Sequence, residues 1–103
     1  MLVYIAGSGA MGCTIGYHIQ KNTESEVILL DYWQEHIDQI NKNGLEVTEK
    51  IEDRIEIQAL KPPQASRKAD LIIVMTKSMK LDSMMQDIAH LTSEKTQILC
   101  LLN

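Results

Sequence analysis

Long hydrophobic runs are absent from this sequence of 103 residues. Uninterrupted apolar runs such as Leu71 to Met75 and Ile98 to Leu102 are far shorter than the roughly 18 to 20 residues that a membrane-spanning helix needs. The start also lacks the basic region of a secretory signal peptide. We therefore expect no membrane partner and no secretion.

Cysteine is scarce, and basic residues form no stripe. The two cysteines, Cys13 and Cys100, fall in an expected helix and an expected strand, and no spacing is typical of metal ligands, so we predict neither a disulfide framework nor a metal site. Ten scattered lysines and arginines with a net charge of −4 argue against nucleic acid. These features favour a small-molecule role in the cytoplasm.

A glycine-rich turn dominates the first third of the sequence. The apolar run Leu2 to Ala6 leads into Gly7-Ser8-Gly9-Ala10-Met11-Gly12, a helix-like segment, a second apolar run Val27 to Leu30, and Asp31. Asp31 follows Gly12 by 31 − 12 = 19 residues, and dinucleotide-binding βαβ units place an acid about 20 residues after this motif. The pattern predicts a nucleotide site, with an ordinary tight turn as the alternative.

Each part of that pattern has a physical role. Gly7 permits a sharp turn, Gly9 leaves room for a pyrophosphate, and Gly12 allows close packing of the helix on the sheet. The pyrophosphate would meet free amide groups at the positive end of the helix dipole. Asp31 would hold a ribose hydroxyl.

The remaining pattern alternates helices with strands. We predict a helix at 10–21 with Met11, Ile15 and Ile19 facing the core, and Gly16 at a close helix–sheet approach. The other expected elements are a helix at 34–43 capped by Gly44, half-exposed strands at 45–47 and 55–59 joined by a turn at 49–54, a strand at 71–75, a helix at 79–90 and a buried strand at 96–102.

This order predicts one α/β domain, residues 1–103, with a Rossmann-like, doubly wound parallel sheet and a small β-insert between Leu45 and Ala59. Ligands of such sheets bind at the carboxyl ends of the strands. Four patches would converge there: the glycine turn, Asp31, Thr76-Lys77 and Asn103.

With these patches in view, the chain resembles the amino-terminal domain of the ketopantoate reductase (2-dehydropantoate 2-reductase) family over essentially all its residues. The resemblance rests on Ile5 to Gly12, the Asn43-Gly44-Leu45 corner, the segment Ala69 to Ser78 and a strand that closes on Asn103. The family continues with a glycine-rich turn and a helical carboxy-terminal domain, so the chain is expected to be a fragment that is inactive alone.

The resemblance implies hydride transfer from a nicotinamide dinucleotide to the C2 carbonyl of a 2-keto acid, ketopantoate in the usual case, in a protein that could form a homodimer. The implied cofactor-binding residues are Gly7, Ser8, Gly9, Ala10, Met11, Gly12, Asp31, Thr76 and Lys77. Asn103 would help to position nicotinamide and substrate, and the general-acid lysine would lie in the missing domain.

Asp31 stands where members that use NADPH often carry an arginine. A carboxylate binds a ribose hydroxyl but repels a 2′-phosphate, so NAD(H) is favoured. Lys77 and Lys80 could meet that phosphate and keep NADP(H) as an alternative.

Other functions and roles stay open beside this interpretation. An NAD-dependent D-2-hydroxyacid dehydrogenase shares the scaffold, and a nucleotide-sensing regulatory domain shares the glycine turn but has no evident need of Thr76-Lys77. Trp33 is expected to pack, with adenine stacking as the alternative. Cys13 is expected to be a small packing residue. His18, His36 and His90 appear isolated, and none is expected to act as a base.

Overall fold

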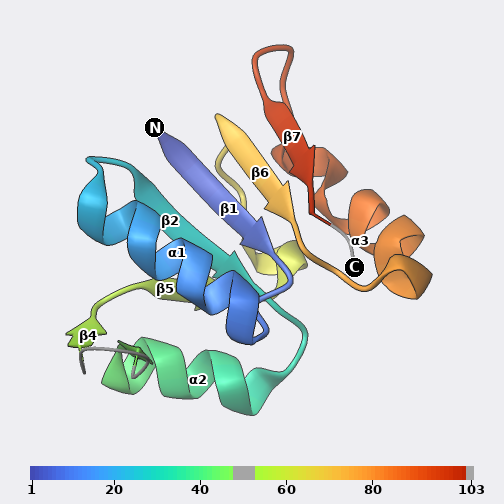
Figure 1. Cartoon of the computed structure of the whole chain (residues 1–103). Helices are drawn as coiled ribbons and strands as arrows, with labels where there is room; N and C mark the ends of the chain where they lie inside the picture. The colour runs from blue at the N-terminus through green and yellow to red at the C-terminus, as the bar shows by residue number, and fades with distance from the viewer. Residues whose placement is uncertain (48–52, 102–103) are drawn as a thin grey trace.

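The computed structural model describes residues 1–47 and 53–101 of the chain (Figure 1). The expected turn at 49–54 therefore falls mostly outside the described residues, as does Asn103. In chain order, the elements are β1 (Leu2–Ala6), α1 (Ala10–Asn22), β2 (Glu26–Leu30), α2 (Gln34–Asn43), β3 (Leu45–Val47), β4 (Asp53–Ile55), β5 (Gln58–Leu60), η1 (Pro62–Gln64), β6 (Leu71–Val74), η2 (Ser78–Lys80), α3 (Leu81–Ile88), η3 (Ala89–Leu91) and β7 (Gln97–Cys100).

Five strands form one parallel sheet in the order β5-β2-β1-β6-β7. Strand order reverses at β1, which pairs with β2 on one side and β6 on the other. Helices α1 and α2 cover one face and α3 the other (Figure 1). The predicted doubly wound α/β fold is confirmed.

Alternate side chains of the central strands feed two separate cores. From β1, Val3 and Ile5 pack with residues of α1 and α2, whereas Tyr4 and Ala6 pack with residues of α3 and η3. This alternation requires strands that are apolar on both faces, as the uninterrupted runs predicted. Because all the strands of this sheet run parallel, their carboxyl ends lie at one edge.

The first helix lies unusually close to the sheet. A Cβ atom added at Gly16 would come within 2.9 Å of a Leu29 methyl group on β2, so the predicted close approach at this glycine is confirmed. The buried positions of α1 are Gly12, Cys13, Gly16 and Tyr17. Ile15 and Ile19 are partly buried against the same core.

The expected inward orientation of Met11 is wrong. Met11 is 60% exposed, whereas Gly12 and Cys13 next to it are buried, so the buried face of α1 begins at Gly12 and Cys13 and Met11 points away from it. The helix expected at 79–90 is present as α3 between two short 3-10 segments, η2 and η3.

The predicted single strand at 55–59 is two strands with different partners. β4 pairs antiparallel with β3, and β5 joins the main sheet beside β2. The period-two pattern runs across both strands, because Ile55, Ile57 and Ala59 all face the same core, and so it conceals the change of partner.

The prediction that the last strand is buried is also wrong. Every residue of β7 is exposed, including Ile98 and Leu99. Its one partner among the described residues is β6. Apolar composition alone could not show that β7 has a single neighbour and little cover.

Candidate dinucleotide site at the carboxyl ends of the strands

The glycine turn begins with a residue that needs a special backbone conformation. Gly7 has a φ of +102°, which L side chains rarely adopt, and its amide donates to the Leu30 carbonyl at 3.0 Å. A Cβ atom at Gly7 would lie 3.0 Å from the Thr76 amide nitrogen and 3.2 Å from its hydroxyl oxygen. The turn thus leaves β1 between the ends of β2 and β6.

The next two glycines differ in what surrounds them. A Cβ atom at Gly12 would lie 2.3 Å from the Gly7 carbonyl oxygen, so the start of α1 is folded tightly against the turn. Among residues 1–47 and 53–101, a Cβ atom at Gly9 would have no neighbour within 4 Å. The space above Gly9 is open, and the helix begins one residue later at Ala10.

An α-helix leaves the amide groups of its first turn without intrahelical acceptors. In α1 that turn contains Ala10, Met11 and Gly12, and the Cys13 amide that follows donates to the Gly9 carbonyl at 2.9 Å. These amide groups, the helix dipole and the open space at Gly9 together form an arrangement suited to a phosphate group.

Asp31 lies directly after β2, beside this turn. One carboxylate oxygen accepts a hydrogen bond from the Ser8 hydroxyl at 2.9 Å, and the other accepts from the Tyr32 amide at 2.7 Å. The Asp31 side chain is still 25% exposed. Ser8 is buried, and the hydrogen bond from its hydroxyl orients the Asp31 side chain, whose carboxylate stays partly accessible to solvent.

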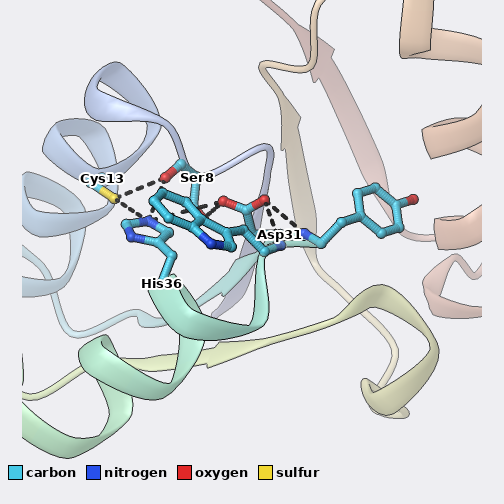
Figure 2. A network of polar contacts seen from close by, with 6 residues as sticks. Ser8, Cys13, Asp31 and His36 are labelled. Carbon is cyan, nitrogen blue, oxygen red and sulfur yellow. Dashed lines mark hydrogen bonds and ion pairs between the residues drawn. The ribbon is translucent and has the colours of Figure 1, made fainter.

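His36, expected to be isolated, belongs to the same network (Figure 2). Its Nε2 atom lies 3.0 Å from the Ser8 carbonyl oxygen and 4.0 Å from the Asp31 carboxylate. The Trp33 ring stacks on the imidazole with centroids 5.6 Å apart and planes at 19°. The sequence carried a usable signal, because a helix beginning three residues after Asp31 must have its first turn at the same edge.

Cys13 completes the network from α1. Its thiol donates to the Ser8 carbonyl at 3.2 Å, and its Sγ atom lies 3.9 Å from His36 Nε2 (Figure 2). Burial, with a smaller contribution from the Asp31 charge, raises the pKa of the Cys13 thiol to about 11. A buried thiol of this kind stays protonated at neutral pH, which confirms the predicted packing role.

Tyr32 bridges toward the other face of the sheet. Its hydroxyl donates to the Asp87 carboxylate and approaches the Met84 sulfur on α3 at 3.9 Å. Burial and the Asp87 carboxylate raise the pKa of Tyr32 to about 12. No sequence pattern predicted this contact, since the two residues are 55 positions apart.

The other expected patch lies at the end of β6. The Thr76 hydroxyl donates to the Ala6 carbonyl at 3.3 Å, so Thr76 is held against the end of β1. Lys77 follows it and is exposed. Of the four expected patches, the structure places three at one edge of the sheet, and the fourth, Asn103, is not among the described residues.

The residues at this edge fit a dinucleotide. The space at Gly9 is of the kind that a side chain would fill and a diphosphate would use, and a solvent-accessible carboxylate follows the adjacent strand.

None of the helices in residues 1–47 and 53–101 combines the length and hydropathy that crossing a membrane requires.

Comparison with known proteins agrees with this geometry. The family described as ketopantoate reductase PanE/ApbA matches residues 3–103. The chain belongs to this family. The 2-dehydropantoate 2-reductase of Streptococcus pyogenes serotype M1 is 53% identical over 103 residues, which are 100% of this chain and 33% of that protein. The enzyme of the same name from Lactococcus lactis is 41% identical over 106 residues, covering 34% of its length.

Among solved structures, a ternary complex of D-mandelate dehydrogenase with NADH and anilino(oxo)acetate superposes with a TM-score of 0.93 at 38% identity. The match covers 100% of this chain and 33% of that one. The chain therefore spans about a third of the length of its relatives, and it corresponds to the amino-terminal domain of a ketopantoate reductase. The D-mandelate dehydrogenase in that complex binds NADH.

Proposed function

We propose that this chain is the cofactor-binding part of an NAD(H)-dependent 2-keto-acid reductase whose substrate is ketopantoate. The observation that carries the proposal is the juxtaposition of the open Gly9 position, the first turn of α1 and the Asp31 carboxylate at one sheet edge. Family membership supports the reaction class. The proposal includes the whole protein, of which this chain is about a third as judged from its relatives.

The bound dinucleotide would supply a hydride from nicotinamide C4 to the C2 carbonyl carbon of the keto acid, with a proton from outside this chain completing the alcohol. The residues of this chain bind and orient. The amides of Ala10, Met11 and Gly12 would hold the diphosphate, and Asp31 would hold the adenosine ribose.

At the far side of β1, Lys77 would contact the adenosine half of the cofactor, and Asn103 would position nicotinamide and substrate. Both assignments rest on the family resemblance. Lys77 has a supporting observation, because it follows Thr76, which is packed against Gly7.

The preference for NAD(H) follows from the charge at the ribose end. A 2′-phosphate carries about −1.5 to −2 charges and would be repelled by a carboxylate that is already fixed by Ser8 and the Tyr32 amide. Lys77 and Lys80 act in the opposite direction and keep NADP(H) as the alternative cofactor.

Cytoplasmic location and a homodimer stay predictions.

A second candidate is an NAD-dependent D-2-hydroxyacid dehydrogenase acting on a different keto acid. The observation in its favour is the close superposition of the D-mandelate dehydrogenase domain. A purely nucleotide-sensing domain is a weaker alternative, since it does not account for Thr76-Lys77 beside the turn.

The test is an assay of the full-length protein with NADH and a panel of 2-keto acids, following loss of absorbance at 340 nm. We expect ketopantoate to have the highest kcat/KM. A higher value for benzoylformate, the keto acid of mandelate, would support the second candidate. Absence of turnover with every keto acid and with both cofactors would contradict the reductase assignment.

A further inference from the structure

His36 is the one histidine of the described residues that contacts the network at the ribose end of the proposed site. His36 sits on α2, yet its Nε2 atom lies against the Ser8 carbonyl of the glycine turn and within 4.0 Å of the Asp31 carboxylate (Figure 2). A ligand group held by Asp31 would therefore also come within reach of the imidazole. No part of the proposed chemistry uses this residue.

The hydrogen bonds define how the ring is held. A carbonyl oxygen only accepts, so the 3.0 Å contact with Ser8 requires a proton on Nε2. The Cys13 thiol donates to the same oxygen from α1. Nε2 is thus a donor whether the ring is neutral or doubly protonated, and gain of a second proton does not break the anchor.

The surroundings accommodate a positive ring as well as a neutral one. The titratable groups that face the imidazole are the Asp31 carboxylate after β2 and the Cys13 thiol of α1, which burial keeps protonated. The Trp33 indole stacks on the ring from α2 itself, and aromatic faces attract cations. Glu35 and Asp38 on α2 are exposed.

We propose that His36 determines the choice between NAD(H) and NADP(H) in a pH-dependent manner. As an imidazolium it offsets the negative charge of Asp31 and attracts a 2′-phosphate, and as a neutral imidazole it leaves Asp31 to exclude that phosphate. Unperturbed imidazoles change charge within the range from about pH 5 to 8. This inference rests on the proposed function, because it assigns the ribose end of the same site.

The experiment measures dissociation constants of NADH and NADPH for the full-length protein by fluorescence titration at about pH 8 and about pH 5.5. We expect the ratio of the NADPH dissociation constant to the NADH dissociation constant to fall by about fivefold or more at the lower pH. A unit charge about 5 Å from a phosphate near a protein surface can produce a change of this size.

The variant His36→Gln separates the imidazole from other effects. Glutamine retains an N–H donor for the Ser8 carbonyl but carries no charge. The 2′-phosphate itself takes up a proton near pH 6, which also weakens its repulsion by Asp31, and this contribution persists in the variant. We therefore expect the ratio of the NADPH to the NADH dissociation constant of His36→Gln to fall by less than about twofold after the same change of pH. His18→Gln, at an exposed position on α1, should behave like the parent protein.

The outcomes distinguish the two proposals. In one outcome, both cofactors bind but the ratio of their dissociation constants in the parent protein is the same at both pH values. In another, that ratio falls as much in His36→Gln as in the parent. Either result shows that the role of His36 is wrong, and the proposed function stands. If neither cofactor binds at either pH, the proposed function is overturned, and this inference with it.

Discussion

Gly9 and Gly12 lie three residues apart but should respond to substitution in opposite ways. Gly12→Ala places a methyl group 2.3 Å from the Gly7 carbonyl, so we expect it to destabilise the fold by about 2 kcal/mol or more. In Gly9→Ala the added methyl group meets no neighbour among the described residues, and Gly9 has an ordinary φ of −69°. We therefore expect the free energy of unfolding to change by less than about 1 kcal/mol while dinucleotide binding weakens. Urea unfolding and cofactor titration of both variants check this pair. Equal stability losses would contradict it.

The buried thiol of Cys13 should make stability depend on alkaline pH. Its folded pKa of about 11 exceeds the unfolded value of 9.0, so its stabilising contribution is complete below pH 9 and is lost as the pH rises to about 11. The loss is on the order of 2 kcal/mol. Unfolding free energies at about pH 8 and pH 10.5 measure it.

Cys13→Ser keeps a donor for the Ser8 carbonyl and removes this titration, so its stability should fall less over the same range. Cys100→Ser, at an exposed position, is the matched control and should keep the parent's slope. The same slope in all three proteins would show that Cys13 is not the titrating group.

Residue positions could be predicted from the sequence where the spacing of a motif determines them. Gly7, Gly12 and Asp31 lie where the motif placed them, because spacing along a βαβ unit determines their position. His36 escaped notice because its contacts are with Ser8 and Asp31, 28 and 5 residues away, and only the fold brings all three together.

At the scale of elements, Tyr32 connects the segment after β2 to α3. Tyr32→Phe removes the hydroxyl that donates to Asp87, and we expect a loss of about 1 kcal/mol at neutral pH. Because the folded pKa of Tyr32 is about 12, above its usual 10.0, this contribution is present below pH 10 and disappears as the pH approaches 12. A double-mutant cycle with Asp87→Asn, by urea unfolding, measures the coupling. Additive effects of the two changes would contradict the contact.

Helices and strands were predicted well where one apolar pattern corresponds to one element, and poorly where one pattern runs across two strands with different partners. β1, α1, β2, α2 and β6 follow directly from apolar runs bounded by glycine or polar turns. The split between β4 and β5 could not be predicted, because both keep alternating inward residues while pairing with different strands. Exposure of β7 likewise depends on its neighbours, which composition does not reveal.

At the scale of the whole molecule, the sheet order explains why distant segments form one site. The chain crosses from β2 to α2 on one side of β1 and from β6 to α3 on the other, so the strand-order reversal lies at the glycine turn. Ligand crevices of open α/β sheets occur at this point. The same order places Asp31 and Thr76 on opposite sides of Gly7.

Asp31 is the residue that we propose recognises the ribose of NAD(H), and the choice of cofactor depends on it. The direct test is titration of the full-length protein and of Asp31→Arg with NADH and NADPH at about pH 8, with Asp38→Arg, on the exposed side of α2, as the matched charge control. We expect the parent and Asp38→Arg to prefer NADH, and Asp31→Arg to prefer NADPH, a change in the affinity ratio of about tenfold or more. Equal affinities for both cofactors in the parent, with no change in Asp31→Arg, would contradict the account.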